Sequence, residues 1–155
     1  MPSITKQSPS VPSTPVTEVP ESTTGFIRLP DNELYFYNGA SWVGLNGARV
    51  VCHLDADVAL NDAVVVEDGT ARVASSDSDK YCSGIVTHIT PARHGVIVSA
   101  GRITKVAAAG EKYFLGIGGA LTASPDPDSQ HIVLVGTGEG DTLLVTLGVT
   151  SEAPI

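Results

Sequence analysis

Short apolar runs alternate with glycine, proline and aspartate along most of this chain. Each run has the length of a β-strand and is rich in β-branched or aromatic residues, which predicts strands rather than helices. The predicted strands are Arg49–Leu54, Ala63–Glu67, Ala71–Ala74, Gly84–Thr90, Val96–Ala100, Ile103–Val106, Tyr113–Gly116, Ile132–Gly136 and Leu143–Leu147. Tight turns are expected at Asp68-Gly69 and Ala100-Gly101. The pattern therefore predicts an all-β domain, a small antiparallel β-barrel or sandwich spanning residues 48–150.

Some of these runs are apolar at consecutive positions, as in Val64-Val65-Val66. Successive side chains of a strand point to opposite faces, so such a strand needs apolar cover on both sides. We expect a second copy of the chain to supply the second cover, which favours an oligomer.

Residues 25–47 carry a more local signal, that of a β-hairpin. The aromatic run Leu34–Tyr37 is followed by Asn38-Gly39, a favoured type I′ turn pair, and by the returning run Ala40–Val43. An isolated hairpin is marginally stable in water, so its aromatic face is expected to pack on the domain or on a symmetry mate. The alternative is a carbohydrate-binding surface formed by exposed aromatic side chains, namely Tyr35, Tyr37 and Trp42.

Residues 1–24 form an extended arm rich in Pro, Ser and Thr, which carries five of the ten prolines. The segment offers too little apolar area to offset the entropy of folding on itself. We expect it to lie along neighbouring subunits or a partner surface. The predicted partner-binding residues are Ile4, Val11, Pro12, Pro15, Val16 and Val19. At the other end, residues 151–155 are expected to be a tail.

The net charge of the chain limits the kinds of partner that it is expected to bind. The formal net charge is −8 and the pI is near 4.7, and the nine Lys and Arg residues are scattered. This pattern argues against nucleic acid as a partner. No apolar run is long enough for a membrane helix, and the first residues lack the regions of a signal peptide, so neither a membrane nor export is expected. Cys52 and Cys82 are expected to be buried small hydrophobes, with a disulfide between them left open.

Several groups of residues have types that could form a chemical site. The glycine-rich stretches at 116–119 and 136–140 lack the spacing of a phosphate loop, and we expect turns and bulges there. Pairs of aspartates two residues apart are expected to be solvated turns rather than calcium ligands. The four histidines are spread along the sequence without a zinc motif. A Cys82/His88 nucleophilic pair would be too far apart on one strand. We therefore predict no catalytic, cofactor or metal site. The aspartate pairs are Asp55/Asp57, Asp77/Asp79 and Asp126/Asp128, and the histidines are His53, His88, His94 and His131.

Two stretches together carry a resemblance to a known class of proteins. The first runs from Tyr113-Phe114-Leu115-Gly116 through Gly118-Gly119-Ala120-Leu121-Thr122 to the closing Thr142-Leu143-Leu144-Val145. The second, Glu33 to Val43, joins a strand, an Asn-Gly pair and a Trp, and is similar to the short hairpins of phage fibre proteins. Together the two stretches resemble virion proteins of tailed bacteriophages, such as head fibres, capsid decoration proteins and tail fibres. The chain has none of the repeats of a long fibre shaft.

The resemblance implies a non-enzymatic structural protein on the virion surface, synthesised and assembled in the host cytoplasm. Its partners would be itself, as a homotrimer, and the major capsid protein or another virion protein reached through the N-terminal arm. A tail-fibre, neck or collar component that binds a carbohydrate receptor is the alternative. A further alternative is a small enzyme, or a carrier domain with an exposed lysine in the Asp79-Lys80 turn.

Overall fold

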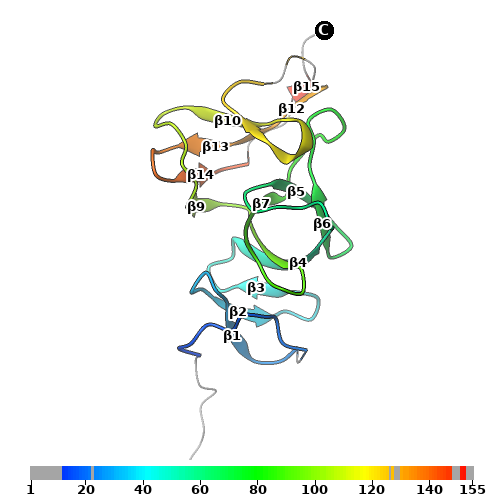
Figure 1. Ribbon diagram of the computed structural model, residues 1–155, viewed down its shortest axis with the longest axis vertical. Helices are drawn as coiled ribbons and strands as arrows, with labels where there is room; N and C mark the ends of the chain where they lie inside the picture. Colours follow the sequence, from blue (N-terminus) through cyan, green and yellow to red (C-terminus); the bar gives the residue numbers. More distant parts are fainter. Residues whose placement is uncertain (1–11, 22, 126, 128–129, 148–150, 153–155) are drawn as a thin grey trace, which may run out of the picture.

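The computed structural model describes residues 12–21, 23–125, 127, 130–147 and 151–152. The described chain is built of strands, with one short 3₁₀ helix, η1 (Ile117–Gly119). The strands are β1 (Phe26–Arg28), β2 (Leu34–Tyr37), β3 (Trp42–Gly44), β4 (Arg49–Leu54), β5 (Ala63–Glu67), β6 (Thr70–Val73), β7 (Gly84–Ile89), β8 (His94–Val98), β9 (Gly101–Ile103), β10 (Lys112–Leu115), β11 (Leu121–Thr122), β12 (His131–Ile132), β13 (Leu134–Gly138), β14 (Leu143–Val145) and β15 (Ser151–Glu152). Figure 1 shows three parts stacked along the long axis: β1–β3 at one end, β4–β8 in the middle, and the remaining strands at the other end.

The middle part is a closed five-stranded barrel. Its strands follow the order β4-β6-β5-β7-β8, and β8 pairs back with β4 to complete the ring. All pairs are antiparallel except β4 with β6, which is parallel. The predicted all-β barrel is therefore confirmed, with one parallel pair that the sequence pattern did not indicate. β4 and β5 have the bounds that were predicted.

Successive side chains of each barrel strand point alternately into the lumen and outward. Cys52, Leu54, Val64, Val86 and Ile97 share a buried cluster in the lumen. The outward set packs into a second, larger cluster together with residues of β1–β3 and of the C-terminal strands. The outward members are Val51, Ala63, Val65, Ile85, Val96 and Val98.

Both faces of the barrel strands are thus covered by the chain itself. Val64 and Val65 are fully buried, on opposite faces of β5. The expectation that a second copy would cover the outer face of these strands was wrong. The cause is that the two flanking parts of the same chain fold back onto the barrel, an arrangement that a local apolar pattern does not specify.

The N-terminal part is a three-stranded meander that continues the sheet of the barrel, because β3 pairs with β4. The β2–β3 hairpin was predicted correctly, but its turn is shifted by one residue. The Asn38 N–H bonds the Ser41 carbonyl at 3.0 Å, which centres the turn on Gly39-Ala40. Gly39 has φ +100°, whereas Asn38 does not have a positive φ. Glycine at the first central position is a preference of type II′ turns, and type I′ would need positive φ at both central residues.

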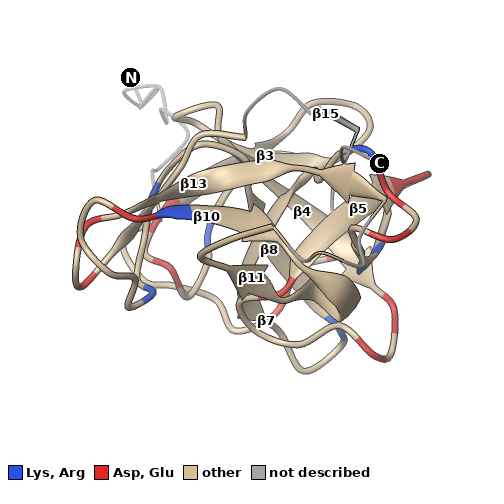
Figure 2. Ribbon diagram, turned by 90° about the horizontal axis from the view of Figure 1, so that it is seen from above, with Lys and Arg blue, Asp and Glu red and all other residues tan. Residues whose placement is uncertain are grey.

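The C-terminal part is a second sheet with strand order β11-β10-β13-β14-β9. Leu115, Val133, Val135, Leu143 and Val145 bury its inner face against the barrel. The predicted strand at 132–136 divides into β12 and β13. The predicted tail contains β15, whose Ser151 and Glu152 pair with Ile132 and His131. Figure 2 shows the acidic residues of the chain mainly in peripheral loops, with Lys and Arg scattered among them.

Candidate functional site: the docked arm and its cleft

The arm does not extend freely over its whole length. The Val16 N–H donates to the Arg28 carbonyl of β1 at 2.7 Å, and the Arg28 Nε donates to the Pro12 carbonyl at 2.9 Å. Val19 is half-buried and packs against the larger apolar cluster. Residues 12–20 therefore lie on the protein's own β1 and barrel, along the free edge of the eight-stranded sheet.

Glu18 is the centre of this docking. Its carboxylate accepts hydrogen bonds from the Thr90 hydroxyl at 2.8 Å, from the Ala92 N–H at 2.8 Å and from the His94 Nδ1 at 2.8 Å. Thr90 and Ala92 belong to the tight connection between β7 and β8, and His94 is the first residue of β8. The Thr90 N–H bonds the His94 carbonyl across this connection. One arm carboxylate thus satisfies donors at one rim of the barrel, more than 70 residues away in the sequence.

The electrostatics of Glu18 favour its charged form. Partial burial raises the pKa of this carboxyl, but hydrogen bonds from Ala92, Thr90, His94 and the Val19 N–H outweigh that effect. The result is a pKa of about 2. Because an ionised carboxylate can only accept hydrogen bonds, His94 Nδ1 is the donor in this contact.

A cleft of about 280 Å³ lies beside the docked arm. Its walls come from the arm, from the β2–β3 hairpin and from the barrel. The imidazoles of His53 and His94 meet here with ring centroids 4.4 Å apart, because the two residues face each other in the β4–β8 register. The lining residues include Val19, Tyr37, Ser41, Trp42, His53 and Asp68.

The predicted partner-binding residues divide into three groups. Ile4 and Val11 lie outside the described residues. Pro12 and Val19 contact the protein's own fold. Pro15 and Val16 are exposed, Val16 at 38%, although the backbone of Val16 is bonded to β1. Removing residues 1–24 as a unit would therefore take away part of the fold as well as the arm.

Glu18 and His94 were not predicted as site residues. The available signal was that Glu18 is the first acidic residue of the arm, whose other charged side chains are Lys6 and Glu21. Its partners lie far along the chain, so spacing alone could not have identified them.

The aromatic residues proposed for carbohydrate binding are mostly core residues. Tyr35 is fully buried and Trp42 is 5% exposed. Tyr37 is half-buried and packs edge-on against Trp42, with ring centroids 5.7 Å apart. Tyr35 and Trp42 therefore act in packing, and Tyr37 is the one of the three with substantial access to the cleft.

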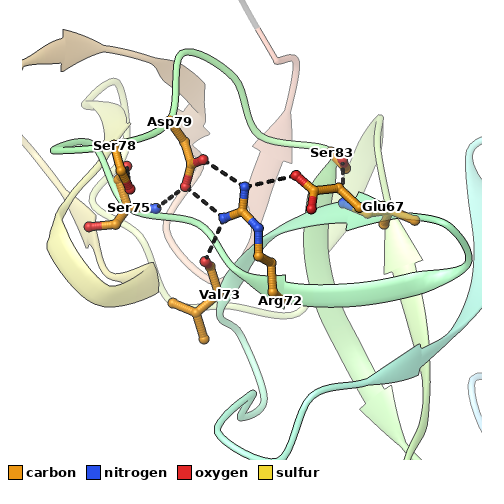
Figure 3. A network of polar contacts seen from close by, with 8 residues as sticks. Glu67, Arg72, Val73, Ser75, Ser78, Asp79 and Ser83 are labelled. Carbon is orange, nitrogen blue, oxygen red and sulfur yellow. Dashed lines mark hydrogen bonds and ion pairs between the residues drawn. The ribbon is translucent and has the colours of Figure 1, made fainter.

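The aspartates considered as calcium ligands lie in different surroundings. Asp79 is buried and bonded to Arg72 (Figure 3), whereas Asp57 and Asp77 are exposed. Asp126 and Asp128 lie outside the described residues. Among the described residues, no group of three or more His, Cys, Asp or Glu side chains is placed to hold a metal ion. Within the same ranges, no helix has the length and apolarity needed to cross a membrane.

The two thiols are free and lie in different apolar clusters, Cys52 in the barrel lumen and Cys82 outside it. Burial raises the pKa of each to about 11. Such thiols are poor nucleophiles at neutral pH. The Cys82 thiol donates to the Gly84 carbonyl at 3.3 Å, and His88 Nδ1 contacts the Thr87 hydroxyl at 3.1 Å, so each of these two residues has its own local partner.

Replacing Glu18 with glutamine is expected to loosen the docked arm and to cost about 1–2 kcal/mol of unfolding free energy, after allowance for solvent screening. The carboxyl has a depressed pKa when folded, so its contribution is full above pH 4.5 and is lost as the pH falls toward 2. Denaturant titrations of both proteins between these pH values would measure this. Glu21→Gln, on the same arm, is the matched control. Equal losses in the two variants would contradict the assigned role of Glu18.

No protein-family model matches the chain, and neither a curated protein nor a solved structure matches it.

Proposed function

We propose that this protein is a non-enzymatic structural component of a tailed-bacteriophage virion, of the capsid-decoration or head-fibre kind. It attaches to the major capsid protein or another virion protein through residues 1–11 and oligomerises through its β-domain. The observation that supports this most is the docking of residues 12–20 by Glu18 onto the rim of the barrel. The docked segment gives the residues that precede it a fixed point of attachment on the barrel.

A fixed point of attachment matters because the affinity of binding through an extended segment is lowered by the entropy lost in ordering that segment. Ordering each residue costs about 1–2 kcal/mol of backbone entropy. Residues 12–20 are already ordered on the barrel, so binding through the arm pays no ordering cost for this part. The segment before Pro12 carries two of the predicted partner-binding residues, Ile4 and Val11.

Self-association is supported by the outer face of β1–β3. Phe26 pairs with Phe36, and Phe36 pairs with Val43, so the three side chains form an apolar row across the meander. Phe26 is 39% exposed, and the other two are half-buried. A homotrimer that buries this row would present three arms together, and multivalent attachment gains about 10²–10⁴ in avidity.

Deleting residues 2–11 is expected to leave the fold, the melting temperature and the oligomeric state unchanged while abolishing attachment to particles. Co-sedimentation of the tagged protein with virions of the phage that encodes it would measure attachment, and native mass spectrometry would measure the oligomer. Ile4→Asp together with Val11→Asp is expected to give the same loss. The matched control is Ser3→Asp with Ser10→Asp, which adds the same charge without removing apolar groups. Wild-type occupancy of the truncated protein would overturn the arm assignment, and a stable monomer would overturn the trimer.

A further inference from the structure

A second, separate pocket lies where the three parts of the molecule meet. Its volume is about 400 Å³. The β1–β2 loop contributes Asp31, β4 contributes Arg49, β7 contributes Thr87 and His88, and β9 with the residue after it contributes Arg102, Ile103 and Thr104. All but one of these residues are polar or charged, which is unusual for a junction between packed sheets.

The guanidinium of Arg49 is the unexplained group in this pocket. Its side chain is 17% exposed, and its nearest ionic partner is Asp31 at 3.7 Å. It makes no hydrogen bond with any other described residue. Asp31 is itself occupied, because it accepts from the Tyr35 hydroxyl and from the Glu33 N–H. A guanidinium has five N–H donors, and the unbonded donors of Arg49 are open to solvent, because no fully buried side-chain nitrogen of the described residues lacks a hydrogen-bond partner.

The other walls supply further donors. A register shift between Val86 and His88 makes Thr87 the extra residue of a β-bulge in β7. Bulges re-aim side chains and occur often beside binding sites. Arg102 lies at the rim, 66% exposed, where Glu139 holds it through hydrogen bonds of 2.9 and 3.2 Å. The hydroxyls of Thr87 and Thr104 complete the polar lining.

The charges around the pocket balance, whereas the whole chain is strongly acidic. Arg49 and Arg102 bring two positive charges against the carboxylates of Asp31 and of Glu139, which holds Arg102, on a protein whose net charge is −8. The donors come from β4, from β7 and from the segment around β9. A tetrahedral anion, whose four oxygens accept from several directions, fits that arrangement better than a planar carboxylate does.

We propose that this pocket binds a small tetrahedral oxyanion, such as phosphate or sulfate, with the Arg49 guanidinium as its main donor. The anion supplies the acceptors that Arg49 lacks and joins the meander, the barrel and the second sheet at one point. A ligand bound there stabilises the folded protein in proportion to its concentration over its dissociation constant.

The test is a titration of the full-length protein with sodium phosphate and, separately, sodium sulfate, at ionic strength held constant with sodium chloride. Amide chemical shifts followed by NMR are expected to change saturably at Arg49, Thr87, His88 and Thr104. Arg49→Gln is expected to weaken binding by at least about tenfold, because it removes a charge-assisted donor. Lys112→Gln, an exposed residue of β10 with the same change in charge, is expected to leave the dissociation constant unchanged.

Thr104→Val provides a second test should Arg49→Gln impair folding, and it is expected to weaken binding severalfold. Saturable binding of both anions, or of phosphate alone, supports the site. Shifts that stay linear with concentration, that chloride reproduces, or that Arg49→Gln and Thr104→Val leave unaltered would overturn it.

Discussion

Replacing Gly136 with alanine is expected to lower the free energy of unfolding by about 3 kcal/mol or more, the upper range of overpacking effects. Gly136 lies in β13, directly opposite Val145 of β14. An added Cβ would fall deep inside the van der Waals radius of the Leu144 carbonyl oxygen and 3.2 Å from the Val145 Cα. Both obstacles are backbone atoms, so the clash cannot be relieved by a rotamer change and β13 must separate from β14.

Equilibrium denaturation by guanidinium chloride would measure the loss, and Gly118→Ala is the matched control. Gly118 has φ +69° and nothing within 4 Å of an added Cβ, so this change adds backbone strain without a clash. It is expected to cost about 1–2 kcal/mol, the penalty of a left-handed conformation for a residue with a Cβ. A Gly136→Ala protein that unfolds at the wild-type midpoint would show that the two strands are not packed at this distance.

The same glycine illustrates how much of the second sheet could be predicted. The stretch 136–140 was expected to consist of turns and bulges, and Gly140, with φ +101°, fits that description. Gly136 and Gly138 instead belong to β13, where glycine is required by the close approach of neighbouring backbone. Composition marks both kinds of glycine alike, and only the partner strand distinguishes a turn glycine from a contact glycine.

Strands were predicted best where a short apolar run is bounded by turn residues on both sides. β4 and β5 have the predicted bounds for this reason. The strand predicted at 103–106 is observed at Gly101–Ile103, because β9 takes its register from β14, and Val106 is left 83% exposed. The parallel pairing of β4 with β6 joins segments whose local patterns are the same as those of antiparallel strands. Topology of that kind depends on tertiary closure and leaves no local signal.

The candidate site was even harder to predict from local sequence patterns than the strand topology. The arm was recognisable from its prolines, yet the docking of residues 12–20 depends on Glu18 meeting a turn at Thr90 and His94. Similarly, the histidines were spread along the sequence, and only the β4–β8 register brings His53 against His94. A barrel brings distant rim residues together, and for that reason its sites are hard to predict from spacing.

Replacing Asp79 with alanine is expected to lower the free energy of unfolding by about 2–3 kcal/mol, somewhat less than the loss typical of a fully buried ion pair. Figure 3 shows the carboxylate between Arg72 and the Ser75 backbone. It accepts two hydrogen bonds from the Arg72 guanidinium, at 2.9 and 3.0 Å, and one from the Ser75 N–H at 2.9 Å. Asp79 is 7% exposed. Arg72 retains Glu67 at 3.0 Å in the variant, which moderates the loss.

The pH dependence of stability provides an independent measurement of the same contact. The Arg72 hydrogen bonds hold the pKa of Asp79 below its ordinary value, against the opposing effect of burial. Its stabilisation is therefore full above the ordinary pKa of 3.8 and is lost as the pH falls through the lower, folded value. Asp79→Ala is expected to remove that part of the acid sensitivity, which denaturant titrations from neutral to acid pH would detect.

Asp77→Ala separates the ion pair from the charge of the loop, because Asp77 is exposed and two residues away. It is expected to change the unfolding free energy by less than about 0.5 kcal/mol. A similar loss in the two variants would mean that charge in the loop, and not the bond to Arg72, is what stabilises this region. A large loss for Asp79 alone would mean that the segment Ser75–Asp79 is fixed to β6 through Arg72 and so helps to hold the barrel closed. The sequence had predicted a solvated turn at this segment.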